Sequence, residues 1–133
     1  MTLVHEDLSE MNLLVNAQTH ELSGVIDWAD ARIFPFGLNL WAIQNILGFM
    51  DNHGWHYYGN HKSLNEKFWK EFFLIIGNVS VQQREAVITA RAIGVFLSFG
   101  FSWEAGTKIP TKEKDNNMRY LDAFSHLLSE KDF

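Results

Sequence analysis

The 133-residue chain contains no cysteine, no basic tract and no long uninterrupted hydrophobic run. The missing cysteines exclude disulfides, thiolate zinc sites and cysteine nucleophiles, and they fit a reducing compartment. A net charge of −5 gives no electrostatic footprint for nucleic acid. The longest apolar-rich region, residues 88–101, contains Arg91 and is too short and mixed to span a bilayer. We therefore expect a cytoplasmic protein with neither nucleic acid nor membrane as a partner.

Glycine-rich phosphate-binding motifs are missing as well. None of the nine glycines falls in a G-x-G pair, and no strand carries a Val-Ala-Ile-Lys run that would supply a phosphate-binding lysine. The sequence therefore predicts that an N-terminal nucleotide-binding lobe is absent.

Apolar residues, by contrast, are plentiful: 47% of the chain is hydrophobic and 14% aromatic. A disordered chain would lack this material, and 133 residues suffice to bury a core. We predict one domain over residues 1–133, an α+β and mostly helical fold in which a small β-hairpin region precedes about four helices.

Local patterns place these elements along the chain. Short apolar runs joined by a polar turn predict a hairpin at roughly residues 12–27, and Pro35 and Gly37 mark residues 31–37 as a connector. The expected helices span residues 38–50, 63–76, 81–99 and 117–129, with Ser63 and Ser80 as N-caps. Residues 55–61 read as an aromatic loop and residues 100–117 as an exposed polar loop.

Two of these helices have apolar positions that indicate an inward face. In the second helix they are Leu64, Phe68, Phe72, Ile75 and Ile76, and in the last helix Tyr120, Leu121, Phe124, Leu127 and Leu128.

The residues with most chemical meaning lie in the first thirty positions. The stretch beginning at His5 reads H-x-D-x-x-x-x-N, with Asp7 and Asn12 at its other two fixed positions, and an apolar run ends at Asp27. A carboxylate that accepts a hydroxyl proton and oxygen ligands that hold Mg²⁺ are what phosphoryl transfer needs from a protein.

With their flanking residues, these positions resemble the aminoglycoside phosphotransferase and choline kinase-like family, which has the protein-kinase fold. The matching stretches are Leu3-Val4-His5-x-Asp7-Leu8, Asn12-Leu13-Leu14-Val15 and Gly24-Val25-Ile26-Asp27-Trp28-Ala29-Asp30. The resemblance covers about residues 1–30, the catalytic loop and metal strand. It implies that residues 38–133 are the helical part of that family's C-terminal catalytic lobe.

The resemblance also implies roles for individual residues. Asp7 would be the catalytic base, His5 would brace its loop, and Asn12 and Asp27 would bind Mg²⁺. Glu6 departs from the family pattern, which has a small glycine between the histidine and the aspartate. Its side chain would crowd the loop, and its charge would oppose an approaching phosphate.

A cationic small-molecule substrate is one interpretation of the acidic residues in this region. Asp30 and Glu10 could bind it beside Asp7 and Asp27, and Trp28 and Trp41 could add cation–π contacts. A metal site plus a solvated helix start is the alternative. For His53, His56 and His61, aromatic packing in the loop is favoured over metal binding.

Two functions follow. The first is an ATP- and Mg²⁺-dependent small-molecule kinase lobe that transfers phosphate to a hydroxyl when completed by a nucleotide lobe. The second is a truncated, kinase-derived domain without ATP-dependent activity, acting as a ligand-binding or scaffold module or as a repurposed small-molecule enzyme. In either case, an exposed apolar face of the lobe would favour a homo-oligomer or a covering partner.

Overall fold

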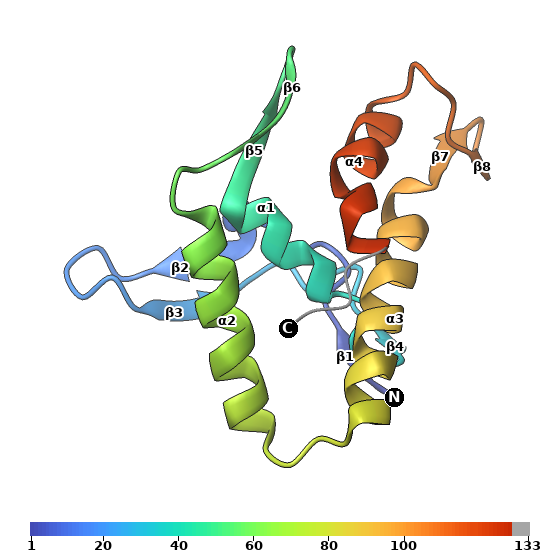
Figure 1. The fold of residues 1–133 in the computed structure, drawn as a ribbon. Coiled ribbons are helices and arrows are strands. Elements are labelled where there is room, and N and C mark those ends of the chain that lie inside the picture. Colours follow the sequence, from blue (N-terminus) through green and yellow to red (C-terminus); the bar gives the residue numbers. More distant parts are fainter. Residues whose placement is uncertain (129–133) are drawn as a thin grey trace.

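The computed structural model describes residues 1–128, so Ser129, the expected end of the last helix, lies outside the described residues. Within them the chain forms four α-helices and four separate two-stranded antiparallel sheets, a mixed α+β architecture (Figure 1). None of the helices in residues 1–128 is long and apolar enough to cross a membrane.

The first sheet joins two segments that lie far apart in sequence. Strand β1 (Thr2–Val4) pairs with β4 (Arg32–Phe34), and Leu3 lies opposite Ile33. The expectation of an irregular connector over residues 31–37 is therefore wrong for its central part. A three-residue strand whose partner is nearly thirty positions away leaves no local signal in the sequence.

The expected hairpin at residues 12–27 is confirmed. Strand β2 (Leu13–Val15) pairs with β3 (Leu22–Val25) and follows a single 3₁₀ turn, η1 (Glu10–Asn12). The side chain of Asn16 shapes the turn because its Oδ1 accepts the backbone N–H groups of Gln18 and Thr19, at 2.9 and 3.0 Å.

The expected helix over residues 38–50 is much shorter than its apolar pattern suggests. A 3₁₀ turn, η2 (Leu40–Ala42), leads into α1 (Ile43–Leu47), and the chain then forms a hairpin of β5 (Gly48–Asp51) and β6 (Gly54–Tyr57). The carboxylate of Asp51 accepts the N–H groups of His53 and Gly54, at 2.7 and 3.2 Å, and so closes the turn. The expected aromatic loop therefore begins as a strand.

The N-cap of helix α2 (His61–Ile76) is Asn60, not Ser63 as expected. The Ser63 hydroxyl lies inside the first turn and donates to the Asn60 carbonyl at 2.9 Å. The expected inward face is also displaced: Trp69 and Phe73 are buried, whereas Ile75 is 81% exposed. The cause is the direction in which α2 meets its neighbours, which periodicity does not reveal.

Helix α3 (Val81–Phe99) has the predicted bounds and the predicted cap. Ser80 accepts the Gln83 N–H at 3.2 Å, and the Gln83 side chain accepts the Ser80 N–H at 2.8 Å, which forms a reciprocal capping box. Gly94, in the middle of the helix, contacts the chain at Leu38 so closely that an added Cβ would lie 1.8 Å from the Leu38 carbonyl oxygen. The glycine thus permits the segment before α1 to cross α3.

Residues 101–110, expected to be irregular, form a hairpin of β7 (Phe101–Glu104) and β8 (Thr107–Pro110). Ala105 and Gly106 have φ angles of 49° and 79°, as a tight two-residue hairpin turn requires. Across this hairpin Phe101 lies opposite Pro110, and Trp103 lies opposite Lys108. Only the following residues, up to the start of α4 (Asn116–Phe124), form an exposed loop.

The main core lies where α4 and the 3₁₀ turn η3 (Ser125–Leu128) meet α3 and η2 (Figure 1). Of the residues expected to point inward from the last helix, Phe124 and Leu127 are buried, but Leu128 is 40% exposed. The core consists of Trp41, Ala42, Val95, Phe124 and Leu127. A second cluster of Trp69, Phe73 and Val87 joins α2 to α3.

Candidate functional site

The loop between β1 and β2 carries Asp7, and the Asn12 side chain holds it closed. Asn12 is buried, and its amide nitrogen donates to the backbone oxygen of Asp7 at 2.7 Å and to the Asp7 carboxylate at 3.1 Å. One buried amide therefore fixes both the backbone and the side chain of an otherwise exposed aspartate.

A second set of contacts brings the Asp27 segment to the same loop. The Ile26 backbone N–H donates to the Asn12 carbonyl at 3.0 Å, and His5 Nε2 donates to the Ile26 carbonyl at 2.7 Å. His5 is buried, and its ring lies edge-on to Trp28 with centroids 4.7 Å apart. The N–H and the carbonyl of Ile26 are therefore both hydrogen-bonded to residues of the β1–β2 segment. As the next residue in the chain, Asp27 lies beside the Asp7 loop.

Two non-glycine residues of this region have left-handed backbones. Glu6 has a φ of 63° and Asp27 a φ of 62°, a region that costs most L-residues free energy and that glycine occupies easily. The Glu6 carboxylate contacts Arg32 Nε on β4 at 3.1 Å. The structure thus shows why a glycine suits position 6, and Arg32 offsets part of the negative charge that Glu6 brings.

These oxygen donors suit a hard cation. Asn12 uses its amide nitrogen for Asp7, which leaves Oδ1 as an acceptor, and the Asp27 carboxylate is exposed. One carboxylate plus one amide oxygen, completed by phosphate and water, is a donor set that Mg²⁺ accepts. The described residues contain no cluster of three or more His, Cys, Asp or Glu side chains that would form an all-protein metal site.

A cavity of about 380 Å³ lies beside Asp7. Asp7, Ser9 and Glu10 form its polar edge, and the other lining residues are Trp41, Asn45, Gly48, Phe49, Met50, Trp55, Phe99 and Tyr120. Its walls thus come from the loop, α1, the β5–β6 hairpin, α3 and α4. A cavity lined by both carboxylates and aromatic rings is a typical setting for a small-molecule site.

The structure brings some of the expected substrate residues together and not others. Glu10 and Trp41 line the cavity with Asp7, although Trp41 is only 5% exposed and packs against Phe99 at 4.8 Å between centroids. Trp28 and Asp30 do not line it. Trp28 instead contacts His5 and donates its indole N–H to the Val25 carbonyl at 2.8 Å.

Sequence reasoning missed Phe49, Trp55 and Tyr120 as residues near Asp7. They lie 42 or more positions away in sequence from Asp7, and only the β5–β6 hairpin and α4 bring them there. The one available signal was the aromatic density of residues 55–61.

The histidines of that segment pack on aromatic rings, as favoured from the sequence. His61 stacks on Tyr57 with centroids 4.5 Å apart, and His56 stacks on Phe49 at 5.3 Å. His56 also contacts the Asp51 carboxylate at 2.9 Å. The backbone N–H of His53 and then the His56 side chain lower the pKa of Asp51 below its usual range.

Comparison with known proteins gives one match. No curated protein and no solved structure matches the chain. Residues 1–59 match the phosphotransferase enzyme family, a range that contains the Asp7 loop, the β2–β3 hairpin, Asp27 and the β5–β6 hairpin. The resemblance seen in the sequence is thereby confirmed, because residues 1–59 are similar to the phosphotransferase enzyme family.

Proposed function

We propose that the chain is the catalytic lobe of a small-molecule kinase, in which Asp7 is the base for phosphoryl transfer to a hydroxyl group. The observation that carries this proposal is the pair of bonds from the Asn12 amide to Asp7, together with the bond from Ile26 to Asn12. They bring three side chains suited to this chemistry to one loop cluster. The family match over residues 1–59 supports the same reaction class.

In this proposal, each residue has one task. Asp7 accepts the proton of the acceptor hydroxyl while that oxygen bonds to phosphorus and the bond to the leaving nucleoside diphosphate breaks. Asn12 and Asp27 would hold Mg²⁺, which neutralises charge on the ATP phosphates when bound. His5, through Ile26, keeps the Asp27 segment against the loop.

The acceptor molecule would occupy the aromatic cavity beside Asp7. Glu10 and Asp7 place negative charge at its edge, and Trp41 offers part of an aromatic wall. A ligand with a hydroxyl group and a positive charge fits this combination because the carboxylates and the π-faces both favour a cation. Asp30 and Trp28, on the Asp27 side, would contact a ligand that extends beyond the cavity.

A nucleotide lobe would have to meet this lobe at its small sheets. Apolar side chains are exposed there, with Leu3 59%, Leu22 59% and Ile33 66% accessible. We infer that this surface is covered when ATP binds, either by a nucleotide-binding lobe or by a second copy of the chain. Sedimentation velocity with and without Mg²⁺-ATP distinguishes a dimer from a monomer.

Calorimetry of Mg²⁺-ATP binding tests the proposal directly. We expect the 133-residue chain to bind, the variant Asp27→Ala to lose at least about tenfold in affinity with its metal ligand, and Asp122→Ala, an exposed aspartate on α4, to bind as the parent does. Equal binding by all three proteins would contradict the role of Asp27 as a metal ligand, and no binding by any of them would contradict ATP-dependent chemistry by this lobe alone.

The cavity beside Asp7 also supports the alternative function, a ligand-binding module without ATP chemistry, because its lining combines carboxylates with aromatic rings. Asp7→Asn separates the two readings. If Asp7 is the base, this variant should abolish phosphoryl transfer, whereas acceptor binding, to which Glu10 and Trp41 also contribute, should fall only in part.

A further inference from the structure

A cavity larger than the one beside Asp7 lies away from it, between α2 and α3. It measures about 720 Å³ and is lined by Asn65, Glu66, Trp69, Lys70, Phe73, Leu74 and Arg84. It shares no lining residue with the cavity beside Asp7. The two helices follow each other through a short turn and diverge from it (Figure 1), and residues of both line the cavity.

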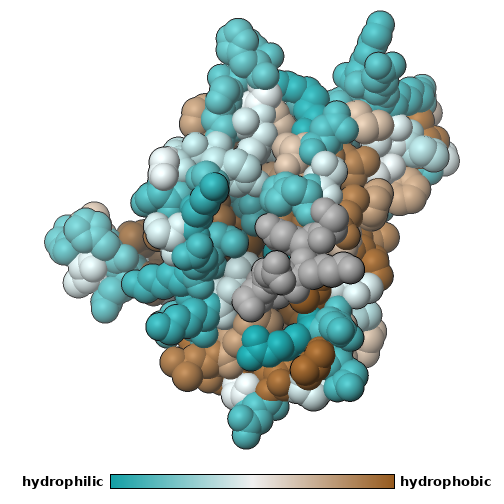
Figure 2. Space-filling view, in the orientation of Figure 1, coloured by the Kyte–Doolittle hydropathy of each residue, from teal (hydrophilic) through white to brown (hydrophobic). Residues whose placement is uncertain are grey.

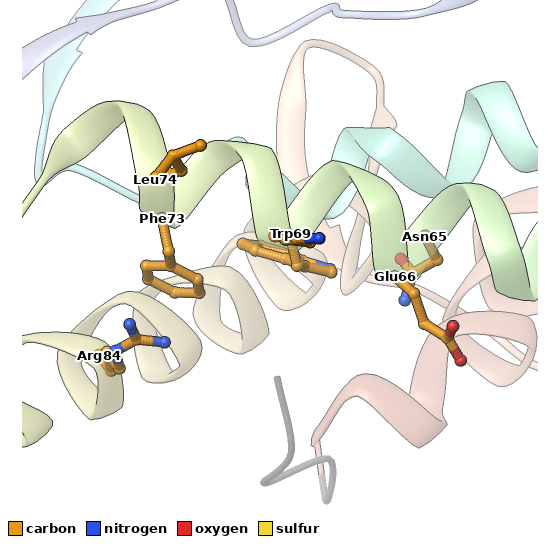
Figure 3. A pocket seen from close by; sticks show the side chains of 7 residues that line it. Asn65, Glu66, Trp69, Phe73, Leu74 and Arg84 are labelled. Atoms are coloured by element: carbon orange, nitrogen blue, oxygen red, sulfur yellow. The ribbon is translucent and has the colours of Figure 1, made fainter.

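The cleft is apolar in the middle and oppositely charged at its ends. Trp69 and Phe73 occupy the central part, Glu66 lies toward one end, and Arg84 of α3 lies at the other, as Figure 3 shows. The Arg84 guanidinium is 4.1 Å from the centre of the Phe73 ring, so its position is fixed against the wall. Lys70 adds a second positive charge to the lining.

The end near Glu66 also offers an acceptor. Asn65 Oδ1 is buried and has no hydrogen-bond partner within residues 1–128. A buried acceptor without a donor costs free energy, and an ammonium group held by Glu66 would be a suitable donor for it. Glu66 and Phe73 are seven residues apart on one helix, which corresponds to about 10 Å at 1.5 Å per residue.

We propose that the α2–α3 cleft is a second ligand site, which binds an elongated apolar zwitterion. Its carboxylate pairs with Arg84, its aromatic or aliphatic middle lies along α2 between Trp69 and Leu74, and its ammonium meets Glu66 and Asn65. The charges at the two ends require opposite charges about 10 Å apart on the ligand. This site is independent of the phosphotransferase function proposed for the Asp7 region.

The test uses 4′-(aminomethyl)biphenyl-4-carboxylate, a rigid zwitterion with an aromatic middle, and two analogues that each lack one charged group. Binding to the full chain is followed by ¹H–¹⁵N NMR. We expect the zwitterion to shift the indole signal of Trp69 and to bind about tenfold more tightly than either analogue.

Variants of the protein then show which end of the ligand each charged residue binds. Arg84→Gln should reduce affinity for the zwitterion about tenfold but leave affinity for the analogue without a carboxylate unchanged. Glu66→Gln should show the converse with the analogue that lacks the amine. Lys114→Gln, an exposed cation in the loop before α4, is the matched control and should change neither. Equal affinities for all three compounds, absence of Trp69 shifts, or equal effects of Arg84→Gln and Lys114→Gln would overturn the proposal.

Discussion

At the scale of single residues, Asn12 connects the parts of the candidate active site. Its amide nitrogen donates to Asp7 twice, and its carbonyl accepts from Ile26. The sequence motif identifies Asn12 as a ligand for a metal, but not as the residue that closes the loop. That second role depends on burial, which a short polar motif does not reveal.

We expect Asn12→Ala to lower the free energy of unfolding by about 1–3 kcal/mol, because it removes a buried amide and the two hydrogen bonds that this amide donates to Asp7. Urea denaturation measures the difference. Asn52→Ala, in the exposed β5–β6 turn, is the matched control and should change the stability by less than about 0.5 kcal/mol. Equal losses in the two variants would mean that the amide contributes no specific stability.

At the scale of elements, the sequence predicted those helices and strands that are determined by interactions between residues close together in the chain. The bounds of helix α3 were predicted correctly because its N-cap is formed by two residues only three positions apart, Ser80 and Gln83. The β2–β3 hairpin was found because its signals lie within fifteen positions. Strand β4 was missed because its partner, β1, is distant in sequence. The β5–β6 hairpin was missed because its first strand continues the helix-like apolar pattern of the preceding residues.

The two serines once expected to be caps give a matched pair. Ser80→Ala removes an acceptor from a free N–H group of α3 and should cost about 1 kcal/mol. Ser63→Ala, inside α2, removes only a hydroxyl bonded to a carbonyl and should cost less than about 0.5 kcal/mol. Thermal denaturation of both proteins checks the order, and a larger loss for Ser63→Ala would show that the first turn of α2 depends on it.

The segment that joins the β7–β8 hairpin to α4 should respond to acid. The Lys112 backbone N–H at 2.8 Å, followed by the Ser102 hydroxyl at 3.0 Å, lowers the pKa of Asp115 below 3.8. A lowered pKa means that the charged form stabilises the fold. This contribution is complete above the ordinary pKa and is lost as the pH falls through the lowered one.

We therefore expect ¹³C NMR titration of the Asp115 carboxyl to give a midpoint below the ordinary value of 3.8. Ser102→Ala should move the midpoint upward, whereas Ser23→Ala, in the distant β2–β3 hairpin, should not move it. An unchanged midpoint in Ser102→Ala would rule out the hydroxyl as a cause.

At the scale of the whole molecule, the N-terminal segment with the candidate site and the helical part are joined where residues 38–42 cross α3. The crossing places Trp41 in the core with Val95 and Phe124, and Trp41 also lines the cavity beside Asp7. The hydrophobic surface visible near the turn between α2 and α3 is a separate feature, at the opposite end of α3 from α4 (Figure 2). The candidate site therefore depends on a crossing that no local pattern predicted.

Gly94→Ala should disrupt this crossing. Its Cβ would lie 1.8 Å from the Leu38 carbonyl oxygen and 2.8 Å from the Trp41 ring, so the backbone must move. We expect a loss of about 3 kcal/mol in the free energy of unfolding and a change in the Trp41 fluorescence. Gly59→Ala, where an added Cβ has no neighbour within 4 Å, is the control. If both variants were equally stable, the close approach at Gly94 would be unimportant.

The β2–β3 turn has a consequence for how the site could be divided. Asp7 and Asn12 precede this exposed turn, and Asp27 follows it. Strands pair across it twice, β2 with β3 and β1 with β4. A chain cut at Gln18 would therefore yield two fragments, one with Asp7 and Asn12 and the other with Asp27, that strand pairing can bring together. The fold thus offers a division point for a split-protein reporter, whose two halves carry separate parts of the candidate site.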